Sequence, residues 1–508
     1  MNVGMVSILV SYFIILLFIG TWASKKIKTA ESFIVAGKEL GFWVFTVLVV
    51  ASCTSGMTLI GVAGLGFKLG WPTIWEQIFV PLACAISIWI FGTKLYRVGK
   101  KKGYLTVQDY FAHRFYSPKA MRGISGFAVL VTSLIYLVGQ YTAVSIVLSW
   151  IFGISHLQAL MIAAIVVMVY VLLGGLYAVS WTSLFQGLIL ILGVLFTAPF
   201  VIVKAGGMSH VNNVLSKISL PFAPAGSMTK LAFPSGAPAF TPAFLVSFFF
   251  LLAFGLASAP HIVNNVLAAK RSGYFKWAPL VAFLIYLPIM YLIKFVGFSV
   301  RAMVTEGVLT LPNVKNAADY SYIAGVQYAL PNVIWAFFAV VVLAAVMSTT
   351  DRLMLTIGSC AGWDIYKNLI NPSASDSKIT TVSRAVVIVA AIGTVLLAIN
   401  PPKLLAWLIW MGIGLMLATF VVPLLAGLYW RRATREGAIS SMLGGFISAV
   451  GAGYYDKFVS HLPVHFSFYG FIVSIVLMVV ISLLTQPPDS KLLDETETGP
   501  FISSRKME

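Results

Sequence analysis

The sequence predicts an all-α integral membrane protein with about thirteen transmembrane helices. Of its 508 residues, 59% are hydrophobic and only 10% are charged, whereas a soluble domain carries roughly 25% charged residues. The mean hydropathy is +0.95. The apolar residues gather in long runs, and a run of about 20 such residues matches the thickness of a bilayer.

Thirteen segments are expected to cross the membrane, within a single transmembrane domain over residues 1–485 that is followed by a short polar tail over 486–508. Because the number is odd, the two termini are expected on opposite sides. In chain order, the expected spans lie near residues 3–24, 42–66, 72–93, 123–152, 156–178, 184–203, 241–268, 277–300, 332–362, 385–399, 404–428, 439–454 and 467–485.

The basic residues predict the orientation. Most of the 34 Lys and Arg residues fall in one set of connections, and cytoplasmic loops collect such residues. We therefore expect a plasma-membrane protein with its N-terminus outside, its C-terminus in the cytoplasm, and external connections at 205–240 and 305–331. The basic connections are residues 25–38, 94–122, 270–276, 431–435 and the tail.

Several function classes are excluded or disfavoured. The formal net charge is +18, but no soluble basic module is visible that would bind nucleic acid. No GxxxxGK[ST] motif is present to bind ATP phosphates, and an enzyme is not expected. Cys53, Cys84 and Cys360 lie in apolar segments without metal-ligand spacing, so they are expected to be reduced core residues.

Two of the expected spans look broken. The second contains GVAGLGFKLG over 61–70, and the seventh contains FGLASAPHIVNN with Pro260 and His261. Unwound backbone in a membrane persists only where it is buried in protein or lines water, and matched interruptions are the best sequence indication of a transporter site. The alternative is that glycine only allows close helix packing.

The ninth span carries hydroxyl groups and charges past its middle. Ser348, Thr349 and Thr350 are followed directly by Asp351 and Arg352. Hydroxyl oxygens, together with carbonyls freed by a broken helix, can replace the water shell of a hard cation such as Na⁺. Alternatively, Ser and Thr can hydrogen-bond within their own helix or hold helices together.

Four stretches together resemble the sodium:solute symporter family, over nearly the whole chain. They are SCTSGMTLIGVAGLGFKLGW (52–71), GGLYAVSWTSLFQ (174–186), SAPHIV (258–263) and AAVMST (344–349). The resemblance implies two inverted repeats of five helices with broken first and sixth core helices. Here the repeats would span about 42–203 and 241–428, with peripheral helices at 3–24, 439–454 and 467–485.

The resemblance also implies site residues beside the first break. A Na⁺ site would combine backbone carbonyls with the hydroxyls of the ninth span, at Ala51, Thr54, Ala345, Ser348 and Thr349. The substrate would contact Ser55, Met57, Thr58, Gln77, Gln140, Ser258 and His261. For Gln140 the alternative is an ordinary helix–helix hydrogen bond, and for His261 it is a buried neutral imidazole.

One departure from the family pattern concerns a second cation. Many relatives read W-T-D where this chain has Trp181, Thr182 and Ser183, so a carboxylate is missing from this helix, while Asp351 and Arg352 occur on the facing one. Three roles are open: Asp351 supplies the carboxylate of a second cation site, Arg352 acts as a tethered cation, or both make structural contacts. A protonatable Asp351 would also permit H⁺ coupling.

Two further charged residues lie in or near spans. We expect Lys294, within the eighth span, to reach the interface or to pair with an anion. We expect Glu76, at the edge of the third span, to lie at the water interface.

These features predict Na⁺-coupled uptake of a small organic carboxylate or zwitterion, such as pantothenate, proline or a monocarboxylate. The cofactor is Na⁺ and the other partners are the solute and the bilayer, while the oligomeric state stays open. The alternatives are an H⁺-coupled symporter that uses Asp351, an uncoupled uniporter or channel, and a membrane sensor.

Overall fold

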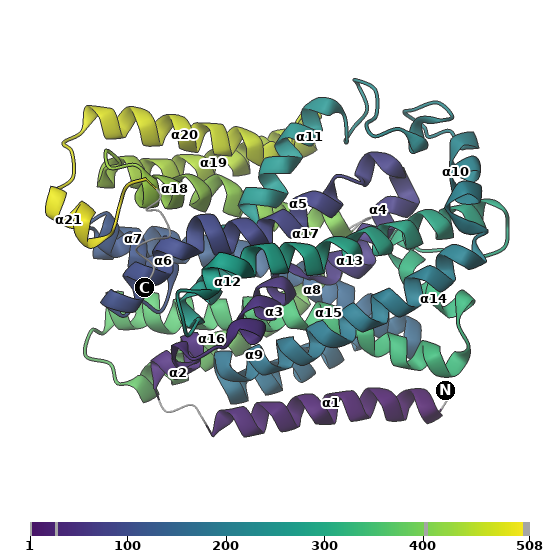
Figure 1. The fold of residues 1–508 in the computed structure, drawn as a ribbon, viewed down its shortest axis with the longest axis horizontal. Coiled ribbons are helices and arrows are strands. Elements are labelled where there is room, and N and C mark those ends of the chain that lie inside the picture. The colour runs from purple at the N-terminus through teal and green to yellow at the C-terminus, as the bar shows by residue number, and fades with distance from the viewer. Residues whose placement is uncertain (1–2, 26–28, 401–404, 501–508) are drawn as a thin grey trace.

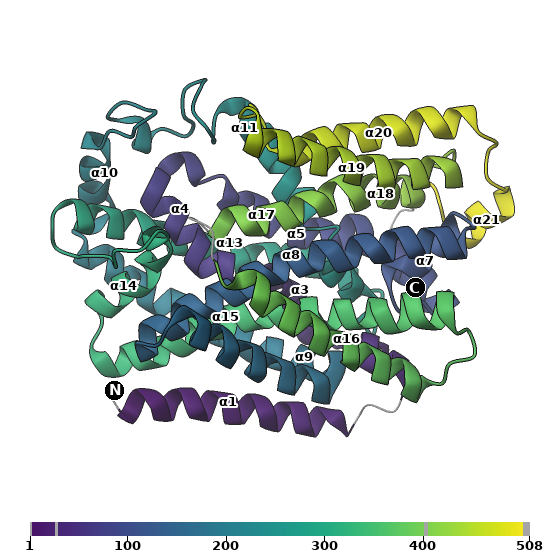
Figure 2. The same ribbon diagram turned by 180° about the vertical axis from the view of Figure 1, so that it is seen from behind.

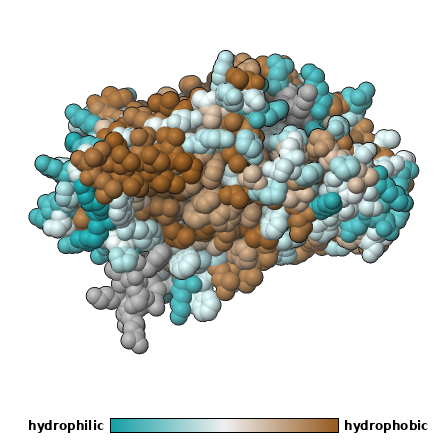
Figure 3. Space-filling model, turned by 90° about the horizontal axis from the view of Figure 1, so that it is seen from above, coloured by the Kyte–Doolittle hydropathy of each residue, from teal (hydrophilic) through white to brown (hydrophobic). Residues whose placement is uncertain are grey.

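The helices of the protein run mostly along its longest axis (Figure 1 and Figure 2). The computed structural model describes residues 3–25, 29–400 and 405–500, and these contain no strand, only two isolated β-bridges. In Figure 3, apolar residues cover much of the middle of the molecule, while hydrophilic residues gather at its two ends. This pattern suits a protein whose long axis crosses a bilayer.

Eight helical segments among the described residues are long and apolar enough to cross a membrane, and two bent pairs raise this number to ten. The eight are Trp71–Lys102 (η3 to α6), Pro118–Phe152 (α8), Gly175–Lys204 (in α9), Tyr274–Thr305 (α13), Val340–Ile370 (in α15 and η9), Asp376–Ala398 (α16), Leu405–Tyr429 (α17 to α18) and Phe466–Leu484 (α20).

The other three predicted spans coincide with α1 (Val3–Ser24), the first part of α9 (His156–Lys204) and α19 (Arg435–Phe458). The number of thirteen and the inverted repeat therefore stay predictions. Figure 1 places the start of α1 and the later α21 (Ser490–Glu495) at opposite ends of the molecule.

Several helices extend beyond the apolar segments that predicted them. The helix expected at 385–399 begins at Asp376, because Ser375 caps it by accepting the Lys378 amide at 3.4 Å and Asp376 adds a negative charge to the first turn. Because such first turns are polar, the apolar runs that predicted the helices do not include them. The spans expected at 156–178 and 184–203 are two helices within α9, and they meet at a kink where the backbone of Gly175 is not helical.

Both spans predicted to be broken are broken, but the first break lies at residues 54–56, ahead of the glycine-rich stretch 61–70, which is helical up to Leu69. The first separates α3 (Phe42–Cys53) from the π-helical turn η2 (Met57–Gly61) and α4 (Val62–Leu69), with a bend of 56°. The second separates α11 (Pro242–Phe249) and η6 (Phe250–Gly255) from α12 (Pro260–Val263) and η7 (Asn264–Ala268), with a bend of 41°. The segment 54–59 enters the middle of the bundle through the first break.

The connection at 305–331 folds over α4, the second half of the first broken helix. It contains the short helix η8 (Ala317–Tyr320) and α14 (Ser321–Ala329), which both contact α4. A Cβ atom on Gly64 of α4 would lie 3.0 Å from Asp319 Oδ1, so glycine at this position permits a close approach that a larger residue would push apart. Asp319 Oδ2 accepts the Leu405 amide at 3.1 Å, which ties the connection to the start of α17.

Burial raises the pKa of Asp319 from 3.8 to about 7, although the Leu405 N–H and Lys68 oppose this shift. The folded state therefore holds more protons than the unfolded state between these values. We expect thermal stability to fall as the pH rises from about 4 to about 7, by an amount on the order of a few kcal/mol, and then to level off.

Thermal unfolding of Asp319→Asn against the wild type, across this pH range, measures the effect, because only the wild type should show this contribution. Asp456→Asn is the matched control, since Asp456 is a less buried carboxylate outside η8. Identical pH profiles for the wild type and Asp319→Asn would contradict the assignment.

Candidate functional site

The hydroxyl groups of α15 (Asn332–Ser359) face the first break. The Ser348 hydroxyl lies 3.2 Å from the Ala51 carbonyl oxygen and 3.0 Å from that of Ala345. The Thr349 hydroxyl lies 3.1 Å from the Ala51 carbonyl oxygen and also donates to that of Thr54. The structure thus brings all five residues predicted for Na⁺ into one cluster of oxygen atoms.

These oxygen atoms are available because α3 ends at the break. The Thr54 amide still bonds to the Val50 carbonyl at 2.9 Å, but the chain then leaves the helix, so the last carbonyls have no amide partner further along. The amide of Gly56, which starts the helical turn after the break, donates to Gln140 Oε1 at 2.8 Å. A Cβ on Gly56 would lie only 2.3 Å from the Cβ of Ala143, so glycine is required at this point.

The chemistry of this cluster fits a monovalent hard cation. Each group is a neutral oxygen, and no group of three or more His, Cys, Asp or Glu that could hold a metal is found in the part of the chain that the structure describes. Oxygen ligands select hard cations, whereas imidazole and thiolate ligands select transition metals. The Thr350 hydroxyl, one residue further on, bonds instead to Val346 of its own helix at 2.8 Å.

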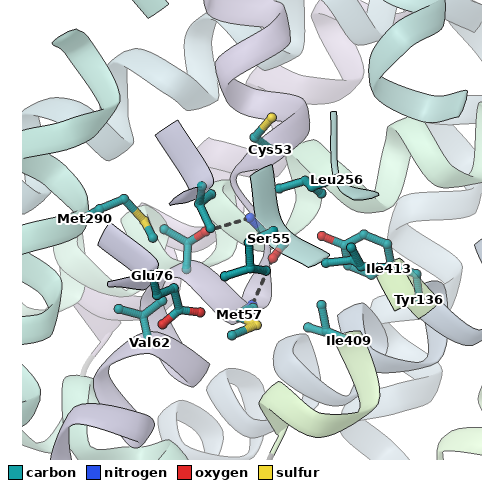
Figure 4. A pocket seen from close by; sticks show the side chains of 13 residues that line it. Cys53, Ser55, Met57, Val62, Glu76, Tyr136, Leu256, Met290, Ile409 and Ile413 are labelled. Carbon is teal, nitrogen blue, oxygen red and sulfur yellow. Dashed lines mark hydrogen bonds between the residues drawn. The ribbon is translucent and has the colours of Figure 1, made fainter. Parts of the chain in front are cut away.

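A small cavity lies beside the break (Figure 4). Its volume is about 20 Å³, room for about one water molecule, so a solute requires that the walls move apart. The walls are mainly apolar, with Ser55, Met57 and Thr58 among them as predicted. The full lining is Cys53, Ser55, Met57, Thr58, Val62, Glu76, Val80, Tyr136, Leu252, Leu256, Met290, Ile409 and Ile413.

Hydrogen bonds fix the unwound segment at the cavity. Thr58 Oγ1 accepts the Ser55 amide at 3.0 Å and lies 2.9 Å from the Tyr286 hydroxyl. Tyr286 also donates to the Cys53 carbonyl oxygen at 3.2 Å. The Ser55 hydroxyl accepts the Met57 amide at 3.2 Å. These bonds satisfy backbone that has no helical partners, so the polar wall of the cavity is built from the break itself.

Four other residues predicted to contact substrate do not line this cavity. Gln77 is buried, and its amide nitrogen can donate to the Ile74 carbonyl oxygen at 2.9 Å. Gln140 binds the break as described, and Ser258 bonds to Gly255 within its own helix turn at 3.0 Å. His261 packs edge-on against Tyr136, which is itself in the cavity wall, with ring centroids 5.4 Å apart.

A buried ion pair borders the cavity. Glu76 is 1% exposed rather than at the water interface, and its Oε2 lies 3.1 Å from the Lys294 ammonium nitrogen. The expectation for Glu76 was wrong because α5 (Glu76–Ile86) begins at a buried position, and the turn before it bonds to the 205–240 connection through Trp71 and Trp75. The position of Lys294 in the middle of a span could have predicted a buried carboxylate partner, because a buried ammonium needs an anion nearby.

The candidates for a second cation lie where α15 packs against α9. Ser183, Asp351 and Arg352 are all buried, and the Ser183 hydroxyl has no hydrogen-bond partner among the described residues. Asp351 interacts electrostatically with Tyr12, which accepts a hydrogen bond from Gln186 of α9 at 3.1 Å. Asp351 also interacts with Tyr141 of α8, so it lies toward α8 and toward the side where α1 meets α9.

Arg352 lies toward the second break, because it interacts electrostatically with His261 of α12. Adjacent residues of a helix project in different directions. Asp351 and Arg352 interact with each other, but only Asp351 interacts with Tyr12 and only Arg352 with His261.

Comparison with known proteins identifies the family. The family model described as "Sodium:solute symporter family" matches residues 33–445. The chain belongs to the sodium:solute symporter family. Members of this family are transporters rather than enzymes, and this chain is accordingly a multi-pass membrane transporter.

Relatives of this symporter-family protein cover nearly its full length. It is 26% identical to the osmoregulated proline transporter OpuE of Bacillus subtilis, over 96% of each chain. It is also 26% identical to the sodium/pantothenate symporter of Escherichia coli, over 90% of this chain and 92% of that protein. The identity with the E. coli sodium/proline symporter is 27%, over 94% and 92%.

Solved structures share the fold. A Na⁺-coupled sialic acid symporter, solved in a substrate-bound outward-open state, superposes with a TM-score of 0.76 at 18% identity, over 96% of this chain and 99% of that one. Mhp1, a nucleobase-cation-symport-1 family transporter, gives a TM-score of 0.56 at 15% identity, over 92% and 98%. This symporter-family chain therefore has the same helical architecture as these transporters.

Breaking the Glu76–Lys294 pair should destabilise the protein strongly. Glu76→Gln leaves a buried ammonium without its counter-charge, and we expect a loss of about 3–5 kcal/mol, measured by thermal unfolding of the purified protein. Adding Lys294→Met removes that charge and should restore most of the loss. Glu436→Gln, in an exposed pair with Arg435 at 2.8 Å, is the control and should change stability by about 1 kcal/mol or less.

If Glu76→Gln unfolds at the wild-type temperature, or if Lys294→Met in the same chain deepens the loss, the pair does not hold these helices together.

Proposed function

We propose that this protein is a secondary active symporter that couples inward Na⁺ movement to uptake of a small carboxylate or zwitterion. The observation that carries the proposal is the convergence of the Ser348 and Thr349 hydroxyls on carbonyl oxygens freed by the first break. The activities for which the relatives are named, sodium/proline and sodium/pantothenate symport, support Na⁺ as the coupling ion.

The substrate class follows from the groups around the cavity. Proline and pantothenate, the solutes of the relatives, both carry a carboxylate. Glu76 is the one charged residue of a mostly apolar cavity wall, and Lys294, which does not line the cavity, compensates its charge at 3.1 Å. Such a wall suits a small solute with an apolar body and a charged end, and it offers few hydrogen bonds to a solute with many hydroxyl groups.

Coupling arises from the shared position of the ion and the solute. The break that would bind Na⁺ through Ala51 and Thr54 continues directly into Ser55 and Thr58 of the cavity wall. Na⁺ would therefore stabilise the backbone conformation that the solute requires, and by linkage the solute would tighten Na⁺ binding equally. A membrane potential adds about 2.3 kcal/mol per charge per 100 mV and would drive the cycle inward.

The same geometry suggests how the site would be exposed to either side. Because the cavity accepts about one water molecule, its walls must separate to admit a solute. The wall is shared between the two broken helices with α5 on one side and α8 with α17 on the other. We propose that these two groups rock against each other in alternating access.

Removing the two hydroxyls should abolish the response to Na⁺. We expect Na⁺, compared with choline, to stabilise the wild type by about 1.4 kcal/mol at ten times its Kd. The variant with Ser348→Ala and Thr349→Ala should lose this stabilisation and any Na⁺-stimulated uptake of proline, pantothenate or short monocarboxylates. Thr350→Ala, which removes a hydroxyl bonded within its own helix, should keep both.

Undiminished Na⁺ stabilisation in the double variant would reject the assigned site. Stimulation by H⁺ rather than Na⁺ would favour proton coupling through Asp351, and uptake that needs neither gradient would favour a uniporter.

The charge moved per solute tests the second cation. Because Asp351 lies on the α9 side, with Ser183 on the facing helix, we propose that it supplies the carboxylate of a second cation site. In voltage-clamped proteoliposomes, Asp351→Asn should lower the charge moved per solute by one, whereas Arg352→Gln should leave it unchanged. More charge moved per solute in Arg352→Gln would instead assign Arg352 as a tethered cation. If neither variant changes the charge moved, both residues make structural contacts only.

A further inference from the structure

The segment after α20 folds back onto the end of the bundle that is predicted to be cytoplasmic. After α20 ends at Leu484, the chain forms α21 (Ser490–Glu495) and continues to residue 499 beside α6 (Thr93–Lys102) and α7 (Val107–Arg114). Figure 1 and Figure 2 both show α21 at the same end of the molecule as α6 and α7. We call residues 494–499 the tail segment.

Ion pairs attach the tail segment to α6 and to the turn after α18 (Val422–Tyr429). Glu495 lies 2.8 Å from the Lys102 ammonium, and Glu497 pairs with Lys101 of the same helix. Asp494 lies 3.2 Å from the Arg431 guanidinium, beyond the end of α18. The cations of these pairs are all at least partly exposed, so the attraction is sensitive to ionic strength.

Two buried cations also donate hydrogen bonds to oxygen atoms of the tail segment. The Lys94 ammonium of α6, only 3% exposed, donates to the Leu428 carbonyl oxygen at 3.0 Å and to the Gly499 carbonyl oxygen. Arg114 of α7 is fully buried, and its Nε donates to Thr498 Oγ1 at 2.9 Å. A buried cation without acceptors is costly, so these contacts favour the attached tail.

The tail segment bridges helices on the two sides of the cavity. Helix α6 continues from α5, whose first residue Glu76 lines the cavity. Helix α7 is fixed to the opposite side, because Asp109 lies 2.6 Å from Arg122 of α8 and Arg122 lies 2.9 Å from Asp364 of η9 (Cys360–Ile370). Residues 103–106 also join α6 to α7 directly, and Lys94 also bonds to Leu428 of α18, so the tail segment adds a further connection to these.

We propose that the tail segment is a latch that holds the cytoplasmic end closed and must release α6 before the site opens inward. The proposal rests on the proposed alternating access, in which α5 with α6 moves relative to α8. Weakening the ion pairs, by substitution or by salt, should therefore shift the protein toward the inward-open state. The latch makes the inward-open population depend on cytoplasmic ionic strength.

Cys53 is a native reporter of inward opening, because it lines the cavity and is buried in this structure. Inside-out membrane vesicles containing the full chain are treated with a membrane-impermeant maleimide in choline chloride. Peptide mass spectrometry then resolves the initial modification rate of Cys53 from those of Cys84 and Cys360. The variant with Glu495→Gln and Glu497→Gln is compared with the wild type.

We expect the variant to react about threefold to tenfold faster at Cys53, the range that two exposed ion pairs can supply. Raising choline chloride from about 0.05 M to about 0.5 M should accelerate the wild type, because salt screens the pairs, and should affect the variant much less. Glu31→Gln, which removes an ion pair with Lys38 in another predicted cytoplasmic connection, should react as the wild type does.

Equal Cys53 rates in the variant and the wild type, or no acceleration of the wild type by salt, would overturn the latch. The salt comparison uses the unaltered chain and therefore does not depend on the variant folding. A separate arm replaces choline with Na⁺, which should slow the wild type if Na⁺ favours the outward-open state. Failure of that arm alone would contradict the proposed Na⁺ coupling rather than the latch.

Discussion

The structure depends on how unwound backbone is satisfied inside a membrane. Where α3 ends, carbonyl groups lose their helical partners, and lipid offers no hydrogen-bond donor in exchange. The hydroxyls of Ser348 and Thr349 supply the donors, and Gln140 and Thr58 accept the freed amides of Gly56 and Ser55. A Na⁺ ion would compete for the same carbonyl oxygens, so the groups that stabilise the break are also those that would respond to the ion.

Buried charges impose a second constraint on the molecule. The Glu76–Lys294 pair joins α5 to α13 beside the cavity, and Arg122 joins α7, α8 and η9 at the predicted cytoplasmic end. Each arrangement compensates for desolvation only while its partners stay in place. Such contacts therefore hold helices together as rigid groups, and motion is expected where the connections are exposed and weaker, as at the tail segment.

Much of the fold could be predicted from sequence, because apolar length and the Gly and Pro breaks are local signals. The hydroxyl residues Ser348 and Thr349 are likewise a local signal in the sequence. That they face the first break could be expected only from the family resemblance. The burial of Glu76 could not be predicted, because a residue at the end of an apolar run looks exposed unless the outer connections that cover it are known.

The polar ends of the helices and the contacts of the tail could also not be predicted from the sequence. The tail is rich in charged residues, a composition typical of solvated segments, and only the folded structure shows Thr498 and Gly499 meeting Arg114 and Lys94. Similarly, Asp351 and Arg352 are neighbours in sequence and interact with each other, yet Asp351 also interacts with Tyr12 and Arg352 with His261, which lie on different elements. Pairings of this kind depend on long-range contacts that a single sequence does not specify.

The most direct test of this account is a pair of high-resolution structures of the protein, one in Na⁺ and one in choline. The account predicts an ion in the Na⁺ structure that is coordinated by the carbonyls of Ala51, Thr54 and Ala345 and by the hydroxyls of Ser348 and Thr349, with those hydroxyls turned away from the carbonyls. The choline structure should retain the hydroxyl–carbonyl hydrogen bonds. The same hydrogen bonds in both structures, with Na⁺ absent from the break, would contradict the account.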